Sequence, residues 1–256
     1  MNNKPKSSQD HQVPSVEKAI QIIHCLGEAN GEAVSSPELA EQTKSSTSTC
    51  YRILKTLTAA GWVRGDGEKG YRLGAGLLGV LRSVNFLQEI ATSSEPVLTE
   101  LALETGMTAK LSIRQDRNQV TLAAGQPRVP LAVLAPVGVP YPVVQASSGA
   151  ILLARLNDTE IEKIISQASD SDWGCDSPEI LRQRIDQFRN TGQVENIGFN
   201  AMGLDSLACG ISHPHEQLAL TMIGLRGEFT ANKLPSFQQN LLATQNKLET
   251  LFVSQP

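Results

Sequence analysis

The 256-residue sequence is poor in aromatic residues, which make up 4% of it, and its four cysteines stand far apart. Hydrophobic residues reach 40%, so globular cores are expected, and they must be built mainly from aliphatic side chains. Cys25, Cys50, Cys175 and Cys209 show no CxxC spacing. This scatter argues against both a disulfide framework and a zinc knuckle.

Long apolar runs are lacking as well. No stretch of about 18 apolar residues exists, so a membrane-spanning helix is not expected. Residues 1–14 are polar and contain no apolar stretch of the kind found in signal peptides. We expect a disordered arm at 1–14 and a protein of the cytoplasm that has no membrane partner.

The sequence motifs of common enzymes are also missing. There is no Walker phosphate loop, no GxSxG elbow and no HExxH pair. Cys209, His213 and His215 are zinc-type ligands, but Pro214 indicates a turn between them. No fourth ligand is evident, and a catalytic Cys209 would need a base that the sequence does not reveal. We therefore expect no metal, no cofactor and no enzymatic activity.

Charge is distributed unevenly along the chain, whose net charge is −4. Residues 1–90 carry ten Lys and Arg against nine Asp and Glu, whereas residues 91–256 carry twelve against seventeen. Within 44–72 there are six basic residues and two acidic ones. A local basic patch on an acidic protein is typical of a small DNA-binding module, although an ordinary solvated surface is an equally open interpretation.

Helical patterns begin directly after the polar arm. A first helix is predicted between Ser15, the expected N-cap, and Gly27. A second helix opens at Ser35 and Glu38, which have capping-box spacing, and a polar turn follows at about 43–45.

The third helix carries the clearest functional signal. One face is apolar and the opposite face combines hydroxyls, an aromatic ring and two cations, which suits the major groove of DNA. Hydroxyl residues also stand at its N-terminus, where backbone N–H groups and the helix dipole favour a phosphate. Any surface helix has a polar face, but the short helix before it favours a recognition helix. The apolar stripe is Cys50, Ile53, Leu54 and Leu57, and the polar set is Ser46, Thr47, Ser48, Tyr51, Arg52 and Lys55.

A basic hairpin is predicted next. The β-prone runs 62–64 and 71–73 flank a Gly-rich turn and place Arg64, Lys69 and Arg72 on one hairpin. Three helices followed by such a hairpin form a winged helix-turn-helix. We expect these three cations to contact DNA together with the polar set of the third helix.

The remainder of the chain alternates between strand and helix patterns, which indicates an α+β domain. Leu77, Leu78, Leu81 and Val84 form a helical stripe ahead of it. Strands are predicted at about 108–113, 119–124, 131–135, 207–212 and 218–225, and helices at about 158–168, 178–191 and 234–253.

The stretch Ser46–Leu57, then Ala60-Gly61-Trp62-Val63 and Tyr71-Arg72-Leu73-Gly74, resembles the isocitrate lyase regulator (IclR) family. The segments 146–150 and 203–208 fit the same family, so the resemblance covers nearly the whole chain after residue 14. It implies a winged helix-turn-helix at 15–74, a linker helix at 75–90 and a GAF-like α/β effector-binding domain at 91–256. In that family the linker helix helps the DNA-binding heads to dimerise, but the pattern alone fits a helix packed on its own domain equally well.

The resemblance also implies a pocket over the sheet for a small, usually acidic, metabolite. Backbone N–H groups near Ser148 could hold a carboxylate. Arg226 could bind the same carboxylate, or it could be a solvated or salt-bridged residue at the end of its strand. Two departures set this sequence apart: residues 198–202 are uncharged where the family often has acidic residues, and the family's Ser-x-Ser-Gly-Pro strand end is replaced at 224–228. The implied effector-binding residues are Ser147, Ser148, Gly149, Ala150, Cys209, Gly210, Gly224 and Arg226.

The sequence thus favours a ligand-responsive regulator of transcription that binds a double-stranded DNA operator. A repressor is expected, with an activator left open. A homodimer or homotetramer is expected, since a two-fold protein reads two half-sites. Two alternatives stay open. One is a small-molecule enzyme or sensor whose winged helix mediates protein contacts, and the other is a DNA-binding protein that needs no effector.

Overall fold

The computed structural model describes residues 13–198, 203–214 and 216–253. The chain divides into two compact units, Met1–Asn85 and Phe86–Pro256. The boundary falls inside the segment 75–90, for which a linker was expected. Most of the expected arm, the uncharged segment 199–202 and His215 lie outside the described residues.

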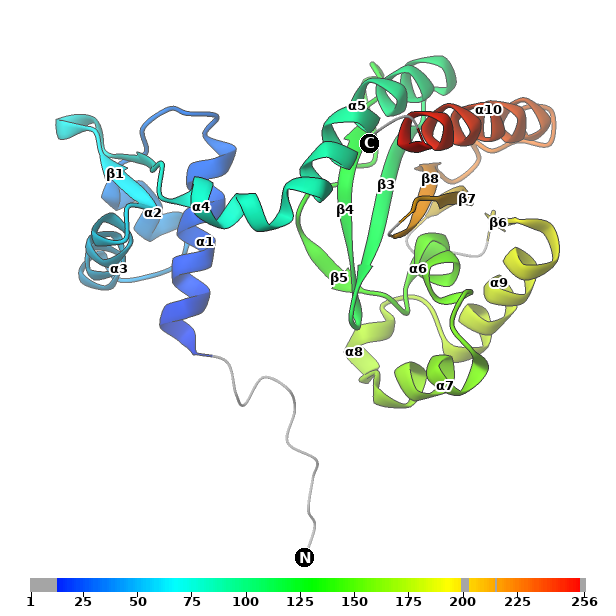
Figure 1. Cartoon of the computed structure of the whole chain (residues 1–256), viewed down its shortest axis with the longest axis horizontal. Coiled ribbons are helices and arrows are strands. Elements are labelled where there is room, and N and C mark those ends of the chain that lie inside the picture. Colours follow the sequence, from blue (N-terminus) through cyan, green and yellow to red (C-terminus); the bar gives the residue numbers. More distant parts are fainter. Residues whose placement is uncertain (1–12, 199–202, 215, 254–256) are drawn as a thin grey trace, which may run out of the picture. The chain divides into compact units, whose positions relative to one another are not determined.

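The first unit is a helix-turn-helix followed by a two-stranded wing, as the sequence predicts (Figure 1). The first helix begins at Pro14 with Val13 as its N-cap, so the prediction that Ser15 caps it is wrong. Proline suits the first helical position because its missing N–H would have no partner there. The elements are α1 (Pro14–Glu28), α2 (Ser36–Gln42), α3 (Thr47–Ala59), β1 (Val63–Gly65), a 3-10 turn (Gly67–Lys69) and β2 (Tyr71–Leu73).

Two local predictions for this unit are confirmed. The Ser35 N–H donates to the Glu38 carboxylate at 2.9 Å and the Glu38 N–H donates to the Ser35 hydroxyl at 3.4 Å, which completes the capping box at the start of α2. The predicted apolar stripe of α3 is buried, and it packs with Ile22 and Leu39 in the core of the unit. Its opposite face is therefore left for solvent or a partner.

The second unit is an antiparallel sheet in the order β5-β4-β3-β8-β7-β6 with helices on both faces (Figure 1). It is entered through α4 (Leu77–Leu81) and a 3-10 turn (Arg82–Val84). The further elements are α5 (Asn85–Thr105), β3 (Thr108–Gln115), β4 (Asn118–Gly125), β5 (Pro140–Pro142), α6 (Ala146–Leu153), α7 (Asp158–Gln167), α8 (Asp170–Trp173), α9 (Pro178–Thr191), β6 (Gln193–Asn196), β7 (Leu204–Ser212), β8 (Gln217–Leu225) and α10 (Leu234–Val253).

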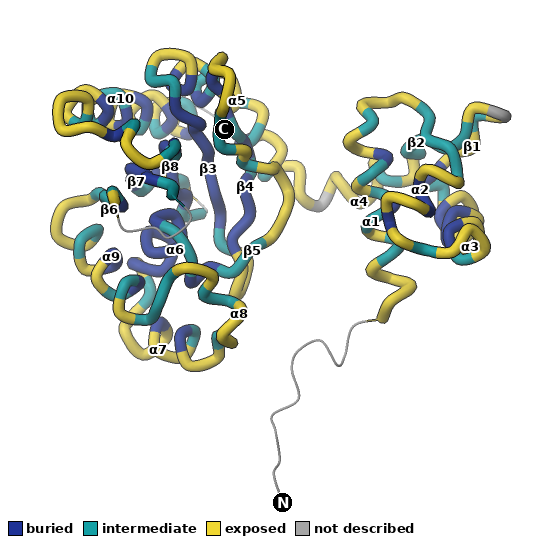
Figure 2. Tube along the Cα trace, turned by 180° about the vertical axis from the view of Figure 1, so that it is seen from behind, coloured by how far each residue is buried: buried dark blue, intermediate teal, exposed yellow. Residues whose placement is uncertain are grey.

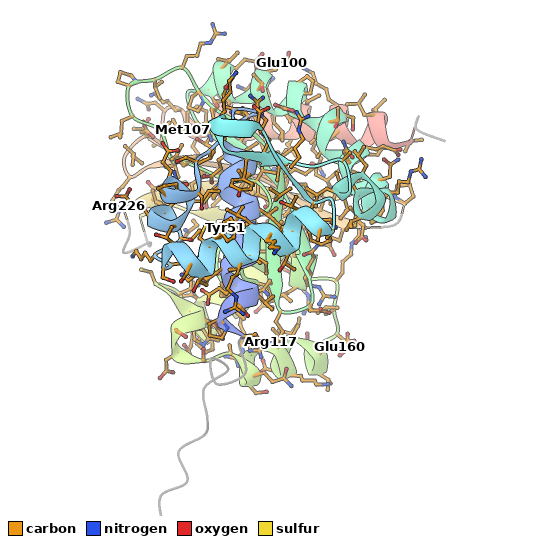
Figure 3. All side chains as sticks on the ribbon, turned by 90° about the vertical axis from the view of Figure 1, so that its left-hand side faces the viewer. Tyr51, Glu100, Met107, Arg117, Glu160 and Arg226 are labelled. Carbon is orange, nitrogen blue, oxygen red and sulfur yellow. The ribbon has the colours of Figure 1, made fainter. Side chains whose placement is uncertain are left out.

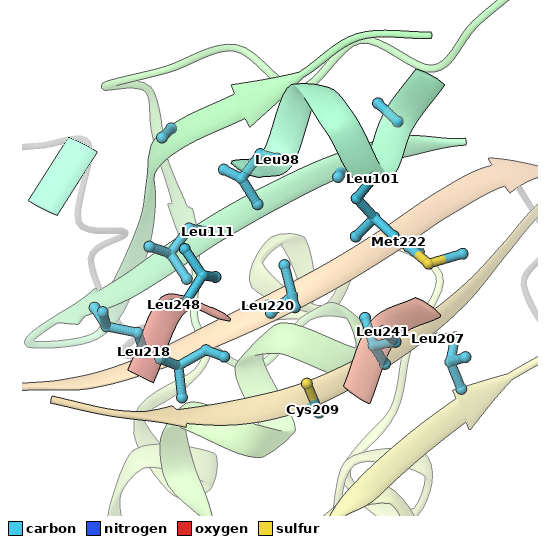
Figure 4. Close-up of a cluster of buried hydrophobic side chains, with 14 of the residues drawn as sticks. Leu98, Leu101, Leu111, Leu207, Cys209, Leu218, Leu220, Met222, Leu241 and Leu248 are labelled. Carbon is cyan, nitrogen blue, oxygen red and sulfur yellow. The ribbon is translucent and has the colours of Figure 1, made fainter. Parts of the chain in front are cut away.

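The two faces of the sheet differ in chemistry. The face under α5 and α10 is filled with leucine, isoleucine and methionine side chains (Figure 4). Successive residues of a strand point to opposite faces, so on β3 Leu111 joins this core while Lys110 and Ser112 face α6. Figure 2 shows the strands buried between helices whose outer sides are exposed. Polar side chains therefore gather in the layer between the sheet and α6.

One strand prediction is wrong. The β-prone run 131–135 lies in the loop between β4 and β5. A hydrogen bond of 2.6 Å from the Thr108 hydroxyl to the Val133 carbonyl joins this loop to the sheet. Pro130 and Pro136 bracket this run, and proline cannot donate to a strand ladder. The short edge strand β5, which does pair with β4, was not expected because two of its three residues are prolines.

Candidate DNA-binding surface and effector site

The outer face of α3 is exposed as the sequence predicts. Ser48, Arg52 and Lys55 lie on it together with Tyr51, whose side chain is 56% exposed and projects from the helix (Figure 3). A large aromatic ring at such a position contributes little to the core of its own unit. A hydroxyl, an aromatic ring and two cations on one helix face form a surface that can contact base edges and phosphates.

The start of α3 is shaped by Ser46. Its hydroxyl accepts the Thr49 N–H at 3.2 Å and lies 3.1 Å from the Ser48 hydroxyl. Ser46 is therefore the N-cap of α3, and its hydroxyl is engaged within the helix. Thr47 is exposed beside it.

The three cations of the wing differ in whether they have a partner within the unit. Arg64 and Lys69 are exposed. Arg72, the cross-strand neighbour of Arg64, forms an ion pair of 3.0 Å with Asp66 and donates to the Gly31 carbonyl. Its guanidinium is thus engaged inside the unit, which differs from the DNA contact expected for it. Two arginines on paired strands repel each other, and Asp66 relieves that repulsion at Arg72.

Lys18 on α1 was not anticipated from the sequence. Its ammonium donates to the Thr43 carbonyl, which follows the end of α2, and to Gln21 at 3.2 Å. A cation at a helix C-terminus satisfies carbonyl groups that lack partners within the helix. Lys18 therefore fixes α2, and with it the turn into α3. No spacing signal could have identified this role, because it joins residues 25 positions apart.

In the second unit, the expected serines belong to α6 and face the polar layer between this helix and the sheet. Ser147 and Ser148 are fully buried, and their hydroxyls contact Ser206 at 2.9 Å and Gln119 at 2.7 Å. Gly149 lies so close to the Val143 carbonyl that a Cβ atom there would overlap it. The next residue, Ala150, belongs to the core between α6 and its neighbouring helices. Gly149 and Ala150 therefore serve close packing.

The N-terminus of α6 already has a carboxylate. The Ala146 N–H donates to Asp176 at 2.7 Å, and the same Asp176 oxygen forms an ion pair of 2.9 Å with Arg184. Arg184 also donates to Asn196 at 2.9 Å. The first N–H of this helix is thus occupied by the protein itself, although the sequence suggested that the helix start could receive a ligand carboxylate.

The remaining expected effector residues do not converge. Cys209 lies in the leucine-rich core on the opposite face of the sheet (Figure 4), where burial raises the pKa of its thiol. Gly224 lies on that face too, since a Cβ there would meet Met107. Gly210 stays on the α6 face, next to Phe188. The physical reason is the alternation of strand residues, which prevents neighbours such as Cys209 and Gly210 from lining one pocket.

Arg226 lies beyond the end of β8. It is exposed, and its backbone N–H donates to the Gly203 carbonyl at 2.7 Å (Figure 3). This hydrogen bond ties the segment after β8 to the residue just before β7. Arg226 is therefore not part of the buried polar layer under α6.

Sequence reasoning missed the most unusual residue of the polar layer. Lys110 on β3 is only 7% exposed, its ammonium donates to the Tyr141 hydroxyl, and it lies 4.9 Å from the centre of that ring. The Tyr141 hydroxyl is in turn 3.4 Å from Ser148. The sequence did contain a signal for Lys110, because a lysine stands in the middle of a β-prone run. Since successive strand residues face opposite sides of the sheet, this lysine lies on the face opposite the leucine-rich core.

The described residues contain no group of three His, Cys, Asp or Glu side chains that could hold a metal ion. His213, considered above as a zinc ligand, stacks edge-on against Phe252 at 5.1 Å. Within the same described ranges, no helix has both the length and the apolar character needed to cross a bilayer.

Comparison with protein families matches both units. Residues 15–67 match the IclR helix-turn-helix domain, and residues 84–250 match the C-terminal domain of bacterial IclR transcriptional regulators. The transcriptional repressor IclR of Escherichia coli K12 is 26% identical over 234 residues, which cover 88% of this chain and 85% of the relative. The repressor AllR of the same organism is 25% identical over 202 residues, covering 77% and 74%. These relatives are transcriptional repressors and not enzymes.

Solved structures agree on the fold. A transcriptional regulator from Rhodococcus sp. RHA1 superposes with a TM-score of 0.68 at 20% identity, covering 95% of this chain and 99% of that one. An IclR homologue from Microbacterium hydrocarbonoxydans, complexed with 4-hydroxybenzoate, gives a TM-score of 0.67 at 18% identity and covers 92% and 98%. With both of its units matched by the family's own models, this chain belongs to the IclR family of bacterial transcriptional regulators.

Proposed function

We propose that this chain is a ligand-responsive repressor that binds operator DNA through α3 and the wing and senses a small acidic metabolite in its second unit. The observation that carries the proposal is the outer face of α3, where Tyr51, Arg52 and Lys55 are exposed beside the hydroxyls of the helix start. Relatives that match most of the chain are repressors, which supports the same activity here.

The DNA contacts divide by chemistry. Arg52, Lys55, Arg64 and Lys69 neutralise phosphates and give affinity, while Tyr51 and the hydroxyls reach base edges or sugar. Each phosphate contact releases counterions, so the affinity for operator must fall steeply with salt.

A homo-oligomer is part of this proposal. Leu78, Leu81 and Val84 in the segment that leads out of the wing are 63%, 46% and 40% exposed. Apolar side chains at this spacing suit contact with a second copy, and a dimer in the cytoplasm would read a two-fold operator.

The sensing site we propose is the polar layer between the sheet and α6. Ser147, Ser148 and Gln119 line it with hydrogen-bonding groups inside an otherwise apolar unit, which is the composition of a small-molecule site. The Microbacterium homologue named above was crystallised with a hydroxylated aromatic acid, which supports an acidic ligand for the present chain as well.

A direct test selects genomic DNA fragments with the purified full-length protein and measures binding to the best fragment by fluorescence anisotropy. Small acids are then added to the complex. Release of the specific fragment by one acid, at a concentration that leaves a random fragment unaffected, supports both halves of the proposal. Specific binding that no acid changes would favour the effector-independent alternative. Absence of any specific fragment would favour a winged helix that serves protein contacts.

A further inference from the structure

Lys110 is a buried cation without a counter-charge. Its side chain lies in the layer under α6, and no described carboxylate forms an ion pair with it. Its partners, the hydroxyl and the ring face of Tyr141, are neutral. Burying an ammonium group is costly unless a negative charge accompanies it, so this position is destabilising in the protein alone.

Two buried hydroxyl groups lie on the same face of the sheet, and neither has a hydrogen-bond partner among the described residues. Thr221 is the direct cross-strand neighbour of Lys110, and Ser112 follows Lys110 by one full strand repeat. Their exposures are 2% and 0%. Unsatisfied buried hydroxyls are uncommon in folded proteins because each has lost its hydrogen bonds to water.

Two of the strand neighbours of these groups are alanines. On the same face, Ala124 pairs with Lys110 across β4, and Ala208 stands beyond Thr221 on β7. The carboxylate of Asp176 on the α6 side is engaged with Arg184 and the N-terminus of the helix. Among the described residues, the layer therefore combines the Lys110 ammonium and two unsatisfied hydroxyls with no carboxylate that pairs with the lysine.

We propose that Lys110 and Thr221 are the anchor for the carboxylate of the effector, with Ser112 serving a second polar group of the same molecule. This assignment rests on the proposed sensing function and specifies its binding residues. The ligand carboxylate accepts hydrogen bonds from the Lys110 ammonium and the Thr221 hydroxyl, and it supplies the missing counter-charge. Neutral analogues, such as the corresponding amides, bind poorly because they leave the ammonium uncompensated.

The test uses full-length protein, three carboxylate probes (formate, acetate and benzoate) and the neutral analogue benzamide. Calorimetric titration and thermal shift are measured for the wild type, Lys110→Met, Lys110→Arg and the matched control Arg155→Met, which removes an exposed cation of the same unit. We expect saturable binding of at least one carboxylate to the wild type and to Arg155→Met. Lys110→Met loses affinity by about 30-fold or more, as for other losses of one partner from a buried charge pair, and Lys110→Arg retains part of it.

A second readout needs no ligand. Lys110→Met should melt at the same temperature as the wild type or higher, because it removes an uncompensated buried charge. A lower melting temperature for Lys110→Met would show that the lysine is structural and would overturn the proposal. So would equal binding of a carboxylate to the wild type and Lys110→Met, or no binding of any of the three. In each of these cases the sensing function itself would still be judged separately, by release of operator DNA.

Discussion

The carboxylate of Asp176 accepts the backbone N–H of Ala146 at 2.7 Å and thereby fixes the first residue of α6. Ala146 has a φ of +64°, a left-handed conformation that costs a residue with a side chain about 1–3 kcal/mol. The same carboxylate forms an ion pair of 2.9 Å with Arg184, and both side chains are less than a tenth exposed. A buried ion pair therefore holds the helix that covers the candidate effector site.

Replacing this carboxylate should destabilise the second unit strongly. Asp176→Ala removes the counter-charge of the buried Arg184 guanidinium, and such a loss costs about 3–5 kcal/mol of unfolding free energy. Urea unfolding followed by circular dichroism measures it. The matched control is Asp158→Ala, whose ion pair with Arg189 is exposed and should contribute less than about 1 kcal/mol. Similar losses in both variants would contradict the role given to Asp176.

Gly149 should not tolerate a side chain. In Gly149→Ala the new methyl group meets the Val143 carbonyl, and overpacking of this kind costs about 1–3 kcal/mol. Differential scanning calorimetry should show a lower melting temperature. Gly27→Ala in α1 is the control, because its methyl group would meet no atom within 4 Å and alanine favours the helix. Equal melting temperatures for Gly149→Ala and the wild type would argue that α6 can move away from Val143.

The two wing arginines should behave differently. Arg64→Ala should weaken binding to DNA and lower the slope of log affinity against log salt by about 0.9, the amount expected for one phosphate contact. Arg72→Ala should leave that slope unchanged and lower the melting temperature instead, since its guanidinium binds Asp66 and the Gly31 carbonyl. Anisotropy titrations at several salt concentrations distinguish the two. A reduced slope for Arg72→Ala would return this residue to the DNA interface.

Thiol labelling should follow burial. Cys175 is exposed, whereas Cys50 and Cys209 are fully buried, and burial raises the pKa of both buried thiols. The reactive thiolate of Cys209 is therefore scarce at neutral pH, and it becomes accessible only after unfolding. A maleimide reagent should label Cys175 quickly, and this phase should vanish in Cys175→Ser. Rapid labelling of Cys209 in the folded protein would contradict its placement under α10.

The sequence was sufficient for most helices and strands and for the amphipathic character of α3, but not for the loop at 131–135 or the edge strand β5. Capping residues such as Ser35 and the apolar stripe of α3 act locally, so their spacing is enough to place them. The effector residues were harder to predict, because motif order along the chain does not say which face of the sheet a residue occupies. Cys209 was grouped with Ser148 for that reason, and the structure places them on opposite faces.

Long-range contacts account for the rest of what the sequence could not show. The sequence predicts that Arg72 contacts DNA, and it does not show that the guanidinium donates to the Gly31 carbonyl, 41 positions away. The sequence does not single out Lys110 as buried, since its burial depends on α6 and on Tyr141, 31 positions along the chain. Both cases concern cations, whose function depends on whether a partner within the fold already occupies them.

The central claim, that α3 reads operator DNA, is tested most directly by comparing the wild type with a Tyr51→Ala, Arg52→Ala double variant. Anisotropy is measured on the selected genomic fragment and on a random fragment at one salt concentration. The wild type should prefer its fragment by about 10³-fold or more. The double variant should lose this preference while its melting temperature is unchanged, because both side chains are exposed. An unchanged preference in the double variant would show that these two side chains of α3 do not read the operator.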